Sequence, residues 1–199
     1  MQAKPLLFDP LLGHLRNAAN GDKKAAAALV RAISPKLFGI SYRLLQNQSD
    51  AEEVTQEALL RLWKIAKEWR AGEAMIETWA YRVVANLSFD KLRSAKKFGA
   101  DQLEDDTFMD DKISAEGELI NRDISNEIDR ALAQLPPRQR AVIVFTYFEA
   151  MGAKETAAAM ETTIEAVESL LSRAKKSLKQ ALLNDEPELL NEYIAVAAI

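Results

Sequence analysis

The chain has 199 residues, 48% of them hydrophobic, a formal net charge of −4, a single histidine and no cysteine. This size allows one domain or two small ones with real hydrophobic cores, and the composition excludes disulfide bonds, thiolate metal sites and histidine clusters. We expect the histidine, His14, to be a partly exposed residue of the first helix. No apolar stretch is long enough to span a bilayer, so we expect a cytoplasmic protein without membrane insertion.

The charge is unevenly distributed along the chain. Residues 1–98 carry 16 Lys and Arg against 10 Asp and Glu, residues 99–133 carry 3 against 11, and residues 134–183 carry 7 against 5. This pattern predicts two basic modules, each able to approach phosphate, with an acidic segment between them. Because the whole chain is acidic, it should bind DNA only weakly by itself.

The first module, residues 1–98, has helical periodicity throughout. Its helices are expected over residues 6–20, 22–33, 35–45, 51–69 and 76–97, with a loop at residues 70–73. Asp22 is the expected N-cap of the second helix, and Pro35 should begin the third. Ser49 or Asp50 should cap the fourth.

An acidic segment and a second module follow. Residues 99–117 contain seven Asp and Glu against one Lys and have too little apolar surface to fold alone, so we expect a flexible linker that lets the modules sample many relative placements. The second module is expected over residues 118–183, with Pro136 and Pro137 opening one of its helices. The apolar residues of the tail, 184–199, indicate a short amphipathic helix.

Residues 153–183 predict two helices joined by a tight turn. The first helix places Ala157 and Ala158 where a crossing helix must approach closely, and Thr163 can cap the second helix. One face of the second helix is expected to be buried: Ile164, Val167, Leu170, Leu171, Ala174 and Leu178. The opposite face is polar: Glu165, Glu168, Ser169, Ser172, Arg173, Lys175 and Lys176. This is the pattern of a helix-turn-helix whose second helix can enter a DNA major groove, although a structural hairpin with a solvated charged face has the same periodicity.

Two motifs, in this order, resemble the bacterial RNA polymerase sigma factors of the sigma-70 family, in the extracytoplasmic-function group. DAEEVTQEALLRLWKIAKEW (residues 50–69) followed by TWAYRVVANLSFDKLRSAKK (residues 78–97) is similar to sigma region 2. LPPRQRAVIVFTYFEAMGAKETAAAM with AVESLLSRAKKSL, within residues 135–178, is similar to region 4. The resemblance implies an all-α protein of two small helical domains, a region 2 bundle and a region 4 helix-turn-helix, joined by the acidic linker.

The resemblance also implies three groups of binding residues. Core RNA polymerase would be bound by acceptors and one aromatic side chain: Asp50, Glu52, Glu53, Gln56, Glu57 and Trp63. The promoter −10 element would be contacted by the loop and helix that follow: Arg70, Trp79, Asn86, Lys91, Arg93, Lys96 and Lys97. The −35 element would be read by the polar face of the last helix: Glu165, Glu168, Ser169, Ser172, Arg173, Lys175 and Lys176. For Trp79 we favour core packing over contact with DNA.

Two positions depart from the family pattern. Glu161 stands where glycine is usual at the turn, so a left-handed backbone there would be strained. Thr156 stands where an apolar residue is usual, which weakens the expected hydrophobic contact.

The interpretation is a sigma factor that binds core polymerase, directs it to promoters and helps melt the −10 element. It is expected to have no catalytic residues, metal or cofactor, and the family implies an anti-sigma factor as a further partner. Two alternatives remain open. One is a sigma-like mimic that sequesters an anti-sigma factor, and the other is an ordinary helix-turn-helix transcription regulator.

Overall fold

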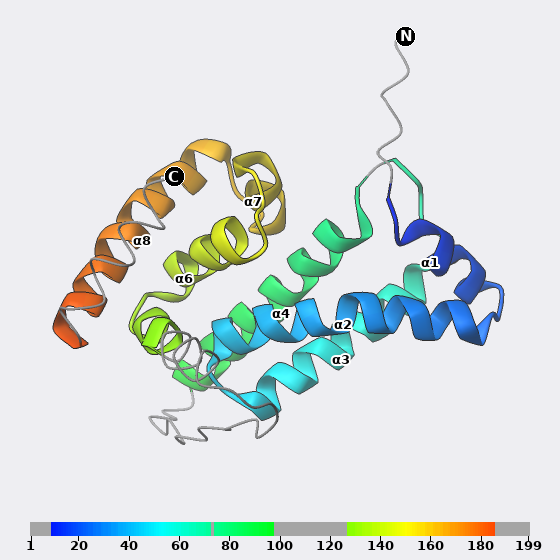
Figure 1. The fold of residues 1–199 in the computed structure, drawn as a ribbon, viewed down its shortest axis with the longest axis horizontal. Helices are drawn as coiled ribbons and strands as arrows, with labels where there is room; N and C mark the ends of the chain where they lie inside the picture. The colour runs from blue at the N-terminus through cyan, green and yellow to red at the C-terminus, as the bar shows by residue number, and fades with distance from the viewer. Residues whose placement is uncertain (1–8, 73, 98–126, 186–199) are drawn as a thin grey trace, which may run out of the picture.

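The computed structural model describes residues 9–72, 74–97 and 127–185, and these residues form helices and connecting turns without a strand (Figure 1). In chain order the elements are α1 (Leu12–Ala19), α2 (Lys23–Leu45), α3 (Gln48–Ile65), α4 (Ile76–Lys97), a helical segment at 127–133, α6 (Pro137–Ile143), the π-helical turn η1 (Val144–Phe148), α7 (Ala153–Ala159) and α8 (Ile164–Asp185). The predicted all-α fold is confirmed. The predicted linker, nearly all of the tail and the start of the predicted first helix lie outside the described residues.

Helix α2 corrects the prediction of two helices with a break before Pro35. Pro35 lies inside one continuous helix of 23 residues, on its exposed side. Proline removes one backbone hydrogen bond, but Leu29, Ile33 and Leu37 on the opposite face are fully buried. Burial of this apolar stripe outweighs the cost of the proline, so the helix continues through it.

Helices α2 and α3 begin at N-caps formed by short polar side chains. Asp22 Oδ1 accepts hydrogen bonds from the backbone N–H groups of Lys24 and Ala25 at 2.8 and 3.1 Å, which confirms the predicted cap of α2. The prediction for α3 is wrong, because Asn47 and not Ser49 or Asp50 is its N-cap. Asn47 Oδ1 accepts from the backbone N–H of Asp50 at 2.9 Å, so α3 begins three residues earlier than expected.

The first module is a bundle in which α2 packs against α1, α3 and α4 (Figure 1). Its core is aliphatic, with Leu37, Leu44, Val54, Leu62 and Val84 at 0–2% exposure. Helix α4 packs on α2 and α3 of the first module and also on α7 of the second module.

The second module packs directly against the first, and the buried residues of both form one hydrophobic core. The ring of Tyr81 on α4 stacks on that of Phe145, with centroids 6.4 Å apart. The buried guanidinium of Arg140 donates from Nη1 to the carbonyl oxygen of Leu44 at 2.7 Å. The sequence predicts modules that sample many placements, whereas the structure shows them packed together through both apolar and polar contacts.

Candidate polymerase and DNA interfaces

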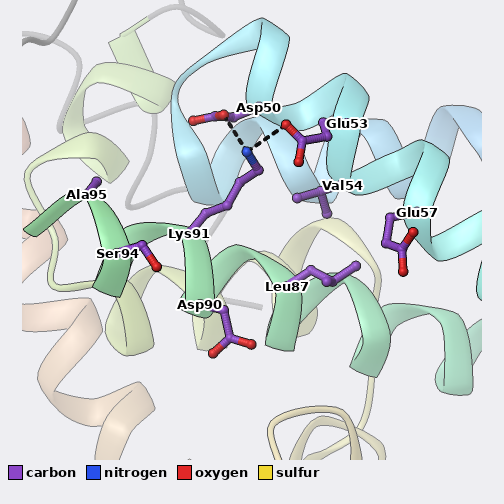
Figure 2. Close-up of a pocket in the computed structure, with 9 residues that line it drawn as sticks. All are labelled: Asp50, Glu53, Val54, Glu57, Leu87, Asp90, Lys91, Ser94 and Ala95. Carbon is purple, nitrogen blue, oxygen red and sulfur yellow. Dashed lines mark hydrogen bonds and ion pairs between the residues drawn. The ribbon is translucent and has the colours of Figure 1, made fainter. Parts of the chain in front are cut away.

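Residues of α3 and α4 line an open groove of about 380 Å³, which Figure 2 shows in close-up. Its walls carry four carboxylates and one ammonium over a floor of aliphatic side chains. The lining residues are Asp50, Glu53, Val54 and Glu57 from α3, and Leu87, Asp90, Lys91, Ser94 and Ala95 from α4. A groove with this lining is suited to a basic helix with an apolar edge, because the walls offer acceptors and the floor offers apolar contact.

Lys91 crosses the groove from α4 to α3. Its Nζ lies 2.7 Å from Asp50 Oδ1 and 2.9 Å from Glu53 Oε2 (Figure 2). Burial alone would lower the pKa of Lys91, but the hydrogen bonds that its ammonium donates to Asp50 and Glu53 outweigh burial, so the pKa is raised and the ammonium stays charged. The sequence predicts a phosphate contact for Lys91, whereas the structure turns this side chain toward carboxylates of its own chain.

The other predicted polymerase-binding residues lie on the same helix as Asp50. Glu57 accepts a hydrogen bond from Arg61 Nε at 2.7 Å, and this bond is the main reason that the pKa of Glu57 is lowered. Glu52 and Gln56 are exposed, and Trp63 is half-buried against the core. The structure therefore brings all five acceptors to the outer surface of α3, while Trp63 packs inward.

The residues predicted to contact the −10 element are spread over the loop before α4 and along that helix. Trp79 packs edge-on against Trp69, with ring centroids 6.0 Å apart, and both are half-buried, which agrees with the packing role favoured for Trp79. Arg70 is exposed and Asn86 is half-buried. Arg93 is exposed, and its Nη2 lies 3.4 Å from Asp90 Oδ1. The side chains of Lys96 and Lys97 lie outside the described residues.

Two contacts that position α4 were not predicted from the sequence. Asp9 Oδ2 accepts a hydrogen bond from the backbone N–H of Ile76 at 2.7 Å and so caps α4 from 67 residues away. Arg82 Nε lies 4.0 Å from Oε1 of Glu161 in the second module. No local sequence signal marks either contact, because both partners come from distant parts of the chain.

Helix α7 and the turn that follows it form the first half of the helix-turn-helix. The contact prediction is right for Ala157 but wrong for Ala158, which is exposed, while Ala159 is buried in its place. Thr156 is fully buried, and its hydroxyl oxygen has no hydrogen-bond partner. Glu161 has φ +48°, so the expected left-handed residue is present at the turn and is not glycine.

Helix α8 presents the predicted polar face to solvent. Thr163 Oγ1 accepts from the backbone N–H of Ala166 at 3.2 Å, which confirms the predicted cap. Val167 and Ala174 are buried as expected, but Ile164, which was also expected to be buried, is 41% exposed. All seven predicted −35 residues are exposed: Glu165, Glu168, Ser169, Ser172, Arg173, Lys175 and Lys176.

Charge and contacts vary along this exposed face. The backbone N–H of Glu165 and the Thr163 hydroxyl lower the pKa of the Glu165 carboxyl, so an anion is held at the helix N-terminus. Arg173 donates to the Ser169 carbonyl oxygen and hydroxyl at 3.2 and 3.3 Å. Lys175 Nζ lies 5.4 Å from the ring centroid of Tyr147, an exposed aromatic that the sequence analysis missed.

The comparisons with known proteins match this arrangement of a bundle followed by a helix-turn-helix. Residues 29–98 match the family model of sigma-70 region 2, and residues 125–178 match that of sigma-70, region 4. The chain belongs to the sigma-70 family. The ECF RNA polymerase sigma factor SigE of Mycolicibacterium smegmatis is 29% identical in an alignment 178 residues long that covers 85% of this chain and 67% of that protein. The ECF RNA polymerase sigma factor SigW of Bacillus subtilis is 25% identical, over 84% of this chain and 94% of that protein.

A solved structure shares the fold. The sigma factor RpoE in complex with the anti-sigma factor NepR, from Bartonella quintana, superposes with a TM-score of 0.62, at 19% identity over 82% of this chain and 99% of that one. The sequence and family matches identify this chain as an extracytoplasmic-function sigma factor, a transcription initiation factor that directs RNA polymerase to promoters. The ordered pair of regions removes the alternative of an ordinary helix-turn-helix regulator.

The described residues offer neither a membrane-spanning helix nor a metal site. No helix in this part of the chain is long and apolar enough to cross a membrane. Within the same residues, no group of three or more His, Cys, Asp or Glu side chains is placed to hold a metal ion.

Proposed function

We propose that the sigma factor binds core RNA polymerase through the outer surface of α3 and the groove beside it. The observation that carries this assignment is the gathering of Asp50, Glu53, Glu57 and Asp90 around an aliphatic floor. Carboxylates that line such a groove complement a basic amphipathic helix of the polymerase. The polymerase-binding residues are then Asp50, Glu52, Glu53, Gln56 and Glu57, with Trp63 as the inner support of α3.

Charge reversal tests this assignment. The Asp50→Lys/Glu53→Lys variant should bind core polymerase at least about tenfold more weakly, because it places cations where a basic partner needs acceptors. Asp22→Asn at the cap of α2 lies outside the groove and is the control. Unchanged binding of the double variant in a pull-down or a fluorescence titration would contradict the role of the groove.

We propose that promoter recognition is divided between the modules, with region 2 in residues 1–98 and region 4 in residues 118–183. The exposed face of α8 would enter the major groove of the −35 element, where Arg173 is best placed to contact a base. Residues 70–97 would bind and help melt the −10 element, with Asn86 facing the bases and Arg70, Arg93, Lys96 and Lys97 close to the backbone.

Single alanine substitutions test the division between the two elements. Arg173→Ala should reduce promoter binding by about tenfold or more if Arg173 reads a base, and only when the −35 sequence is intact. If Arg173 contacts only phosphate, the loss should be similar for all sequences and the salt dependence should become weaker. Asn86→Ala should slow promoter opening while −35 recognition is kept. Intact transcription by both variants from every promoter would contradict the assignments.

An anti-sigma factor is the third partner that we propose. The Bartonella sigma factor, which has the same fold, is held by its anti-sigma factor NepR. The polymerase-binding surface of α3 would be the natural target of such a regulator, since covering it prevents assembly with polymerase. No described contact favours the alternative of a mimic that only sequesters an anti-sigma factor. Assembly with RNA polymerase on promoter DNA would place the protein in the bacterial cytoplasm.

A further inference from the structure

The acidic groove contains a cation of its own, and this cation differs from the other basic residues around it. Arg61 and Arg93 pair with Glu57 and Asp90 on their own helices, and their side chains are 46% and 69% exposed. Lys91 instead reaches across from the opposite wall, 41 and 38 residues from its partners in the sequence, and its side chain is 28% exposed.

The position of Lys91 affects any basic partner that enters the groove. Asp50 and Glu53 lie at the end of the groove where Lys91 Nζ sits between them (Figure 2). A partner cation that binds either carboxylate at hydrogen-bond distance would lie within about 5–6 Å of this ammonium, close enough for direct repulsion. The two arginines can swing into solvent on their own helices, but Lys91 can leave only by giving up both of its hydrogen bonds.

We propose that Lys91 is an internal competitor at the polymerase interface, which occupies Asp50 and Glu53 and thereby limits the affinity of the groove for basic helices. This inference rests on the proposed role of the groove in polymerase binding. It assigns Lys91 to the control of protein binding and removes it from the residues that hold promoter phosphates. A partner has to supply enough positive charge to displace Lys91, so weakly basic helices are disfavoured.

Substitution of Lys91 by methionine removes the charge and keeps most of the apolar stem that covers the floor of the groove. Lys36→Met is a matched control, because Lys36 also forms an ion pair between two helices, with Glu77 at 2.8 Å and 41 residues away, but outside the groove. Lys91→Arg keeps the charge and is the conservative variant. Thermal unfolding of each full-length variant checks that the bundle is intact.

The affinity for core RNA polymerase, measured in fluorescence titrations at low and high salt, tests the proposal. Lys91→Met should bind about five- to tenfold more tightly than the wild type at low salt, and the gain should shrink at high salt because the groove is open to solvent. Lys36→Met and Lys91→Arg should bind like the wild type. In an Asp50→Asn/Glu53→Gln background, Lys91→Met should give no gain in affinity for polymerase, because neutral amides replace the carboxylates for which Lys91 competes.

The possible failures can be told apart. If Asp50→Lys/Glu53→Lys abolishes polymerase binding but Lys91→Met binds like the wild type or more weakly, the competitor role is overturned and the groove assignment stands. If the charge reversal leaves polymerase binding unchanged, the groove assignment is overturned and the competitor role falls with it. If Lys91→Met holoenzyme binds promoter DNA more weakly and with a smaller salt slope, Lys91 contacts phosphate and the proposal is overturned.

Discussion

Single residues in left-handed conformations mark the sharp turns of this protein. Gln46, Ala150 and Glu161 have φ values of 55°, 51° and 48°. Gln46 ends α2, and Glu161 forms the turn of the helix-turn-helix. A residue with a side chain costs about 1–2 kcal/mol more than glycine in this conformation. The Glu161 side chain forms a long, exposed ion pair with Arg82 at 4.0 Å, which is worth little and does not offset this strain.

Glu161→Gly is therefore expected to stabilise the protein. Glycine removes the strain at the turn but gains freedom in the unfolded chain, so the net rise in the free energy of unfolding should be about 0.5–1 kcal/mol. Urea denaturation followed by circular dichroism measures this change. Thr162→Gly, one residue later and without positive φ, is the control and should destabilise. A lower unfolding midpoint for Glu161→Gly would show that the turn is not strained.

Individual helices were largely predictable from the sequence, because an amphipathic period is a local property. The bounds of α4, the cap of α8 and its exposed polar face follow from residues within one helix. The partners of Lys91 and the cap that Asp9 forms on α4 were not predictable, because each joins residues 38 or more positions apart. The prediction of a break before Pro35 was wrong for a similar reason, because burial of α2 against α1, α3 and α4 overrides the local preference of proline.

Helix α2 provides a prediction at the scale of one element. Pro35→Ala restores an N–H donor within the helix and removes the clash of the proline ring with the preceding turn, so it should raise the free energy of unfolding by about 1–3 kcal/mol. The position is exposed, and the core beneath it is unchanged. Ser34→Ala, at the adjacent position, should raise it by only a few tenths of a kcal/mol. Equal effects of the two substitutions in urea denaturation would contradict this account.

At the scale of the whole molecule, the contact between the modules has both an apolar centre and buried polar contacts. Burial and the neighbouring Glu149 raise the pKa of Tyr81, so its hydroxyl stays neutral in the stack with Phe145. Burial lowers the pKa of Arg140 to about 10, and the guanidinium is still charged at neutral pH. It donates to Leu44 of the first module and to Ala133 and Leu135 of the second, so the hydrogen bonds of this one buried cation join both modules.

The rim of this contact depends on Arg43 of α2. Its Nε lies 3.5 Å from Asp129 Oδ1, and its guanidinium lies 4.2 Å from the ring centroid of Phe148, so it touches two separate elements of the second module. Neither module needs Arg43 for its own core, since the side chain lies at their boundary. Removing its charge should therefore weaken the contact between the modules without unfolding either one.

We expect the free sigma factor to be closed and the polymerase-bound form to be open, because recognition of two promoter elements by two modules requires them to separate. The partly buried ion pair and cation–π contact of Arg43 together contribute about 1–2 kcal/mol, so Arg43→Gln should shift the closed-to-open ratio by roughly five- to thirtyfold. The chain has no cysteine, so Ala27→Cys and Lys179→Cys, at exposed positions on α2 and α8, give two unique sites for fluorophores. Single-molecule energy transfer between these two sites should show one short distance in the free wild type and a longer distance with core polymerase. Free Arg43→Gln should have a larger open fraction than Arg31→Gln, a control at an exposed site. One distance that polymerase leaves unchanged would contradict the opening, and identical populations in Arg43→Gln and Arg31→Gln would contradict the role of Arg43 at the rim.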